Sequence, residues 1–206
     1  MSIETTRLIT GTTQGKTNSI ITDRRALLRG VGTFGLSAAA VAVLGGCESM
    51  AASKTATAAD VDILNVALGL EHEAINAYQL GAESGLLQDP VLQVAVLFQS
   101  HHKGHRDALV ATIQKLGGKP VAEKSMNDYA AALNAGSLKS QADVLMLAAR
   151  LEKGAANAYL GVIPSFNDKG LAQVAGRLAA DETMHWTALA SALGESLPGK
   201  PLTFGA

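Results

Sequence analysis

The stretch LEHEAINAY at residues 70–78 recurs 81 positions later as LEKGAANAY at residues 151–159. In this alanine-rich chain, the shared glutamate, asparagine and tyrosine are more informative than the shared alanines. A second repeat, offset by 80 positions, aligns HKGH at residues 102–105 with ETMH at residues 182–185. In each half of the chain the repeat therefore predicts a helix that carries a glutamate, then a turn, then a second helix with an i, i+3 pair of residues ending in histidine. Two such hairpins facing each other can form a dinuclear carboxylate–histidine site in a four-helix bundle.

Apolar periodicity and helix-end signals predict four long helices at about residues 60–87, 89–116, 140–163 and 168–194. In the second helix the apolar stripe contains Val94, Phe98, Leu109 and Ile113. The connection 117–139, with a short helix at about 126–135, is long enough to run the length of the bundle. The predicted fold is therefore all-α, with two repeated helix hairpins joined by a long crossover.

The candidate metal ligands lie inside the apolar stripes. Glu71, for example, has Leu68 and Ile75 within one helical turn on the same face. An unpaired buried carboxylate costs several kcal/mol, and a divalent metal ion compensates for this cost. The predicted ligands are Glu71, His102, His105, Glu152, Glu182 and His185.

The first 59 residues read as an export signal and a tether. TDRRALLR at residues 22–29, with Arg24 and Arg25, resembles a twin-arginine signal, and a mildly apolar segment follows to residue 46. LGGC at residues 44–47 resembles a bacterial lipobox, so Cys47 is the predicted lipidation site. A plain cleaved signal peptide is the alternative. We expect an export signal at 1–46, a flexible tether at 47–59, a bundle at 60–194 and an irregular C-terminal tail at 195–206. The expected location is the periplasm or cell envelope, with membrane attachment through the lipid.

Charge and motif content exclude several classes of function. From Cys47 onward the chain has 12 Lys and Arg against 16 Asp and Glu, so its net charge is about −4, and the charges are dispersed. The sequence has no basic stripe, which argues against nucleic-acid binding. It also lacks a P-loop, a dinucleotide fingerprint and a serine nucleophile elbow. Its single cysteine cannot form an intramolecular disulfide.

These repeats and ligand spacings resemble the ferritin-like superfamily, specifically small exported bacterial ferritin-like domain proteins and, more distantly, rubrerythrins and manganese catalases. The likeness covers about residues 60–194. It implies a ferritin-like four-helix bundle in which Glu71, Glu152 and the two i, i+3 pairs hold two transition-metal ions. His102 stands where the family pattern has a bridging glutamate. The resemblance implies iron first, with manganese, zinc or copper as alternatives. Imidazole in place of an oxygen anion shifts the preference from ferric iron toward softer or lower-valent ions such as Fe(II), zinc or copper.

Several neighbouring residues have more than one interpretation. His101 is the alternative to His102 as a ligand, because it lies four residues before His105 and aligns with Asp181. Tyr78 and Tyr159 lie two helical turns after Glu71 and Glu152. One interpretation is that they are core residues whose hydroxyl groups are hydrogen-bonded. The other is that they contact the metal ligands from outside the site. Two further expectations are that His72 is solvated or interfacial, and that Asn76 and Asn157 contact neighbouring helices.

The sequence favours an exported protein whose metal centre oxidises Fe(II) or consumes peroxide or O2. Such a protein would be a metal-dependent oxidoreductase of the ferroxidase, peroxidase or catalase type, with metal ions and a small oxidant as partners. The alternative is a non-catalytic, metal-binding or stress-related envelope protein with an incomplete site. The sequence alone does not decide between enzyme and binder, and it is compatible with a homodimer.

Overall fold

The computed structural model describes residues 56–205. The predicted export signal, with Arg24 and Arg25, and the lipidation site Cys47 lie outside the described residues, as does most of the tether. The described chain is helical and has no strand. Its four long helices are α2 (Ala58–Glu83), α3 (Asp89–Lys115), α5 (Gln141–Val162) and α6 (Lys169–Ala192), and its short ones are α4 (Met126–Ala132) and the 3₁₀ turns Ala135–Ser137 and Ile163–Ser165. The predicted all-α fold class is confirmed. None of these helices is long and apolar enough to span a bilayer.

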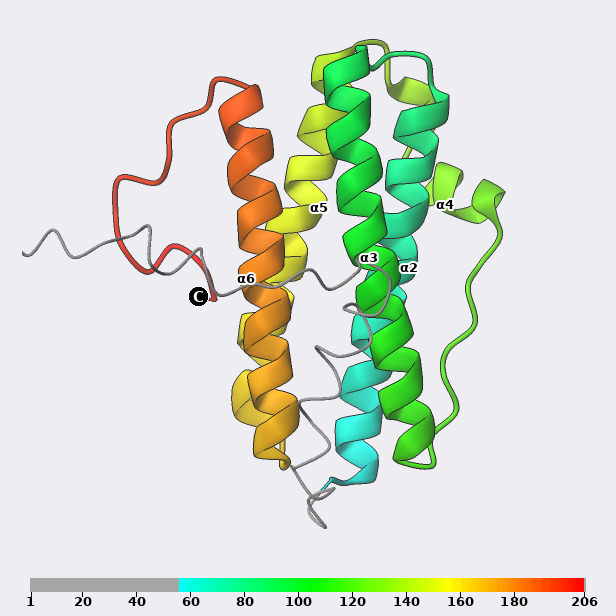
Figure 1. Cartoon of the computed structure of the whole chain (residues 1–206), viewed down its shortest axis with the longest axis vertical. Helices are drawn as coiled ribbons and strands as arrows, with labels where there is room; N and C mark the ends of the chain where they lie inside the picture. The colour runs from blue at the N-terminus through cyan, green and yellow to red at the C-terminus, as the bar shows by residue number, and fades with distance from the viewer. Residues whose placement is uncertain (1–55, 206) are drawn as a thin grey trace, which may run out of the picture. The chain divides into compact units, whose positions relative to one another are not determined.

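The long helices form two antiparallel hairpins, α2 with α3 and α5 with α6, and α2 also contacts α5. Figure 1 shows that α3 ends at the bottom of the view, whereas α5 begins at the top. The crossover between them, residues 116–140, climbs the outer side of α2 and includes α4, which contacts α2. This is the predicted ferritin-like connection, because a simple up-and-down bundle needs only a short turn there.

The crossover covers two polar residues of helix α2. Of the two expectations for His72, the interfacial one holds: His72 is buried, and its Nε2 lies 3.4 Å from the carbonyl oxygen of Val121 in the crossover. Asn76 donates a 2.6 Å hydrogen bond to Glu123 of the crossover. The crossover therefore covers a face of α2 that helical periodicity alone assigns to solvent.

Local chemistry sets the helix ends. Thr57 and Asp60 form a capping box at the start of α2, and the side chains of Ser140 and Asp168 cap α5 and α6. Helix α2 ends at Glu83, four residues before the predicted end, because Gly85 has a φ of +70° that a continuing helix cannot contain. The cap of α3 is Gln88, so Asp89 and Pro90 belong to its first turn.

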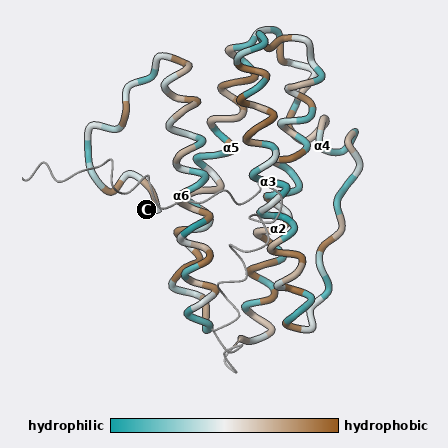
Figure 2. The backbone as a smooth tube through the Cα atoms, in the orientation of Figure 1, coloured by the Kyte–Doolittle hydropathy of each residue, from teal (hydrophilic) through white to brown (hydrophobic). Residues whose placement is uncertain are grey.

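Apolar residues form two main clusters at different levels of the bundle. One contains Leu64, Leu68, Leu109 and Ile113, and the other contains Phe98, Leu145, Trp186 and Leu189. Figure 2 shows hydrophobic and hydrophilic residues alternating along each long helix, as expected for helices with one buried face. Val94 is an exception to the predicted stripe, because its side chain is 41% exposed.

The C-terminal tail lies against the second hairpin. The ring of Phe204 meets that of Trp186 edge to face at a centroid distance of 5.1 Å. The backbone N–H of Gly205 donates a 2.8 Å hydrogen bond to the side-chain oxygen of Asn157. Asn157 therefore contacts the tail, a partner that the repeat did not predict.

Candidate metal centre

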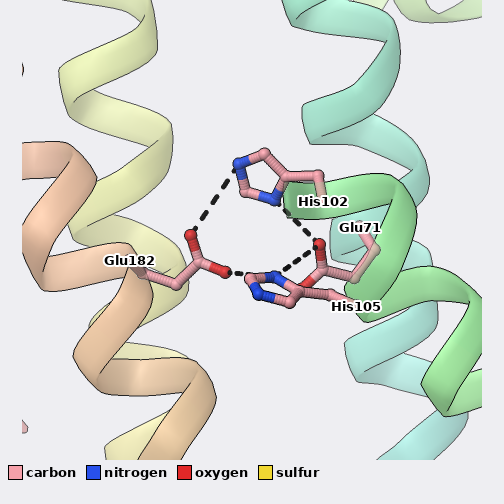
Figure 3. Close-up of side chains that lie close together, drawn as sticks. All are labelled: Glu71, His102, His105 and Glu182. Atoms are coloured by element: carbon pink, nitrogen blue, oxygen red, sulfur yellow. Dashed lines mark hydrogen bonds and ion pairs between the residues drawn. The ribbon is translucent and has the colours of Figure 1, made fainter. Parts of the chain in front are cut away.

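The six predicted ligands converge from all four long helices into one polar layer. Glu71 comes from α2, His102 and His105 from α3, Glu152 from α5, and Glu182 and His185 from α6. Figure 3 shows how four of these side chains point toward one another between the helices. Their ligand atoms form two overlapping groups, each within 4.8 Å: Glu71, His102, His105 and Glu182, and His102, Glu152, Glu182 and His185. His102 and Glu182 belong to both groups.

His102 lies between the two halves of the layer. Its Nδ1 is 2.8 Å from Oε2 of Glu71, and its Nε2 is 3.1 Å from Oε1 of Glu152. An ionised carboxylate only accepts hydrogen bonds, so both ring nitrogens donate and the metal-free ring is an imidazolium. Burial opposes this charge, but hydrogen bonds to Glu152 and Glu71 outweigh burial and raise the pKa of His102 to about 11.

The other two histidines share one orientation, with Nδ1 facing the layer and Nε2 facing outward. Nδ1 of His105 lies 3.3 Å from Oε1 of Glu182, and its Nε2 lies 3.3 Å from Oδ2 of Asp181. Nδ1 of His185 lies 3.3 Å from an oxygen of Glu182, and its Nε2 lies 2.9 Å from Nδ1 of His101. Asp181 and His101 are equivalent positions of the sequence repeat. In the structure both are outer partners that orient a histidine of the opposite hairpin, and His101 belongs to neither ligand group.

The two repeated tyrosines pair across the bundle. The hydroxyl of Tyr78 on α2 donates to Glu152 on α5, and that of Tyr159 on α5 donates to Glu71 on α2. Burial and the nearby glutamates raise the pKa of both phenols well above its usual value, so each remains a proton donor. The sequence placed each tyrosine on the face of its own glutamate, two turns away. The sequence did not reveal that each tyrosine bonds the glutamate of the other hairpin. The one signal was that a glutamate is followed by a tyrosine seven residues later in both repeats, which indicates that the two residue types act together.

Glu182 provides the sharpest evidence that the layer fits a cation. Its side chain is fully buried, and its carboxylate accepts no hydrogen bond of normal geometry, although Nδ1 of His105 and Nδ1 of His185 each lie 3.3 Å from one of its oxygens. Burial raises the pKa of Glu182. For Glu71, burial acts in the same direction, but the facing imidazoles of His102 and His105 outweigh it and lower the pKa to about 2. A metal ion would give the Glu182 oxygens and Nδ1 of His105 a direct partner, and three carboxylates with three imidazoles are a suitable donor set for a divalent transition metal.

Comparisons with known proteins agree with this architecture. A family model described as a ferritin-like domain matches residues 59–195. Among solved structures, the chain is similar to the conserved hypothetical protein rv2844 from Mycobacterium tuberculosis, with a TM-score of 0.56 and 21% sequence identity over 70% of this chain and 96% of that chain. At that identity the likeness supports the fold alone. No curated protein matches the sequence significantly.

Proposed function

Because the chain belongs to the ferritin-like domain family, we propose that its buried polar layer binds two transition-metal ions, with iron as the preferred metal. One ion would be held by Glu71 and His105, and the other by Glu152 and His185. The two groups share His102 and Glu182; a neutral His102 would supply one nitrogen to one ion, because its other nitrogen carries a proton. The observation that carries this proposal is Glu182, whose fully buried carboxylate accepts no hydrogen bond of normal geometry and faces the ring nitrogens of His105 and His185 at 3.3 Å.

When bound, a pair of redox-active ions would supply the two electrons that reduce peroxide or O2, and Fe(II) as substrate would replace those electrons. The chain's own residues hold and orient the ligands. Tyr78 and Tyr159 fix the two terminal glutamates, and Asp181 and His101 fix the two histidines. The apolar clusters around the layer keep bulk water from it. Metal binding requires His102 to give up a proton, so loading would release protons and strengthen as pH rises.

A second candidate is a protein that binds metal without turnover. The position of His102 favours it, because an imidazolium between Glu71 and Glu152 balances much of the negative charge without metal. Such a layer would persist in the metal-free bundle and sequester ions when they are available. The two candidates differ in peroxide turnover rather than in fold.

Motifs at residues 22–47 support export and lipid anchoring, which would place the metal centre in the periplasm or cell envelope. A small oxidant would then reach the centre without crossing the cytoplasmic membrane.

The test is metal analysis of the mature protein, loaded anaerobically with Fe(II) or, separately, with Mn(II) or Zn(II). We expect about two ions per chain, and loss of at least one in Glu182→Gln, which keeps the shape but removes the charge. Glu73→Gln is the matched control, because Glu73 lies on α2 outside both ligand groups. Circular dichroism should show unchanged helix content in both variants, since the apolar clusters are intact.

The outcomes separate the candidates. Peroxide consumption that follows metal content supports the enzyme, and stable metal without turnover supports the binder. Wild-type protein that takes up no transition metal under either reducing or oxidising conditions would overturn the proposed centre.

A further inference from the structure

An apolar cavity of about 310 Å³ lies inside the bundle, beside the polar layer of predicted ligands and toward the α2–α3 turn. All four long helices line it. Its opening lies between α3 and α6, where the exposed residues Val94 and Ala188 form part of the rim. Its floor includes the buried side chains of Tyr78 and Phe98. The exposure of Val94, which its helical spacing did not predict, follows from its place at this opening.

The chemistry of the wall selects an uncharged ligand. Its lining side chains are almost all Ala, Leu, Val, Pro or Phe, and the hydroxyl of Tyr78 is the only polar side-chain group among them. That hydroxyl is already committed, because it donates to Glu152. A carboxylate, phosphate or ammonium group inside the cavity would therefore lose its hydration without gaining a partner. Burial of hydrocarbon, by contrast, is favourable at every wall.

The dimensions select an elongated molecule. The volume is about twice that of an apolar cavity of ~150 Å³ that holds benzene. Along α3 the lining runs from Pro90 to Phe98, a rise of about 12 Å over eight residues. An extended chain covers roughly 3.6 Å in three bonds, so about ten carbon atoms fit this length. We propose that the cavity binds an uncharged, elongated hydrocarbon molecule of about ten carbons, such as a medium-length alkyl chain.

The inner end of this cavity adjoins the polar layer. The ring of Phe98 stacks on that of His185 at a centroid distance of 4.2 Å, and Tyr78 bonds Glu152. A molecule that fills the cavity therefore packs against two side chains that contact the ligand residues. The site itself consists of protein groups alone, so it goes beyond the proposed function and does not depend on bound metal.

Binding can be tested on the mature protein by displacement of the neutral fluorescent probe N-phenyl-1-naphthylamine with n-alkanols. We expect affinity to rise about fourfold per methylene group from hexanol to decanol, and to stop rising once the chain exceeds the cavity length. Decanoate, which has the same chain with a charged end, should bind more weakly than decanol. The result should be the same with and without metal, which separates this test from that of the metal centre.

Two variants fill the cavity. Ala95→Leu adds volume to the wall on α3, and Ala188→Leu adds it at the exposed rim on α6. Each should weaken decanol binding by at least about tenfold, because the added carbons occupy space that the ligand needs. Ala111→Leu is the matched control, since Ala111 is an exposed residue of α3 outside the cavity. If Ala95→Leu does not fold, Ala188→Leu decides the matter.

Decanol binding that is equal in Ala188→Leu and Ala111→Leu would overturn the proposal, as would wild-type protein that binds no alkanol. A wild-type dimer from which decanol displaces no probe would assign the opening to a second copy of the chain, and it too would overturn the proposal.

Discussion

The ring of His102 touches both halves of the polar layer, with one nitrogen toward Glu71 and the other toward Glu152. A glutamate at this position would add a negative charge and offer two oxygens to the metals. A neutral imidazole instead offers one nitrogen to a metal ion, because its other ring nitrogen carries a proton. This single side chain therefore controls both the charge of the centre and the ion that suits it.

We predict that His102→Glu raises the preference for ferric iron, because it restores a fourth carboxylate. His102→Ala should lower metal stoichiometry, because His102 belongs to both ligand groups. His101→Ala is the comparison, since His101 contacts His185 without joining either group. It should keep the stoichiometry and weaken affinity by about 10- to 100-fold. Metal titration with elemental analysis measures all three. Loss of metal in His101→Ala, with both His102 variants behaving as wild type, would move the ligand assignment to His101.

At the scale of elements, Asp60 connects the two hairpins at one end of the bundle. Its Oδ2 accepts a 2.7 Å hydrogen bond from the backbone of Thr57, and its Oδ1 accepts a 2.8 Å bond from the backbone of Asn167. The same carboxylate thus caps α2 and anchors the α5–α6 turn. Burial raises its pKa, but the hydrogen bonds from Thr57 and Asn167 outweigh burial, so the pKa is lowered overall.

We predict that Asp60→Ala lowers the free energy of unfolding at pH 7 by about 2–3 kcal/mol, through loss of a cap and of buried charged hydrogen bonds. The folded-state pKa of Asp60 lies below the unfolded value, so its stabilisation is present above that unfolded value and lost as pH falls through the folded pKa. The difference between wild type and variant should therefore shrink in acid. Urea unfolding at pH 7 and at lower pH measures it, with the exposed Asp62→Ala as control. A difference that does not change with pH would contradict the assigned role.

The elements also show which features the sequence could predict. Helix starts at Ser140 and Asp168 follow from local chemistry, as does the inward direction of Glu71 and Glu152, and these required no knowledge of the fold. The buried state of His72 depends on the crossover, which approaches from 49 residues away in sequence. The exposure of Val94 depends on the opening between α3 and α6. Periodicity predicts which face of its helix a residue lies on, but it does not predict which other segment covers that face.

At the scale of the whole molecule, the proposed export and lipidation motifs would determine where the bundle works. Twin-arginine export carries folded proteins, so a metal could be loaded before transport. We predict that replacing both Arg24 and Arg25 by Lys keeps the precursor in the cytoplasm. Cys47→Ser should release a soluble mature form, because the lipid anchor is lost. Cell fractionation with immunoblotting measures both. An unchanged membrane fraction for Cys47→Ser would contradict lipid anchoring.

The crossed pairing of the tyrosines has a consequence for the origin of the chain. Each hairpin supplies the tyrosine that bonds the glutamate of the other, and each supplies the outer partner of the other's histidine. Two identical subunits around a twofold axis would make the same contacts, so the chain has the form of an ancestral hairpin dimer fused by gene duplication. In such a dimer every substitution occurs twice. After fusion the copies diverge independently, and this freedom allows position 102 to carry an imidazole while its counterpart, position 182, keeps a carboxylate.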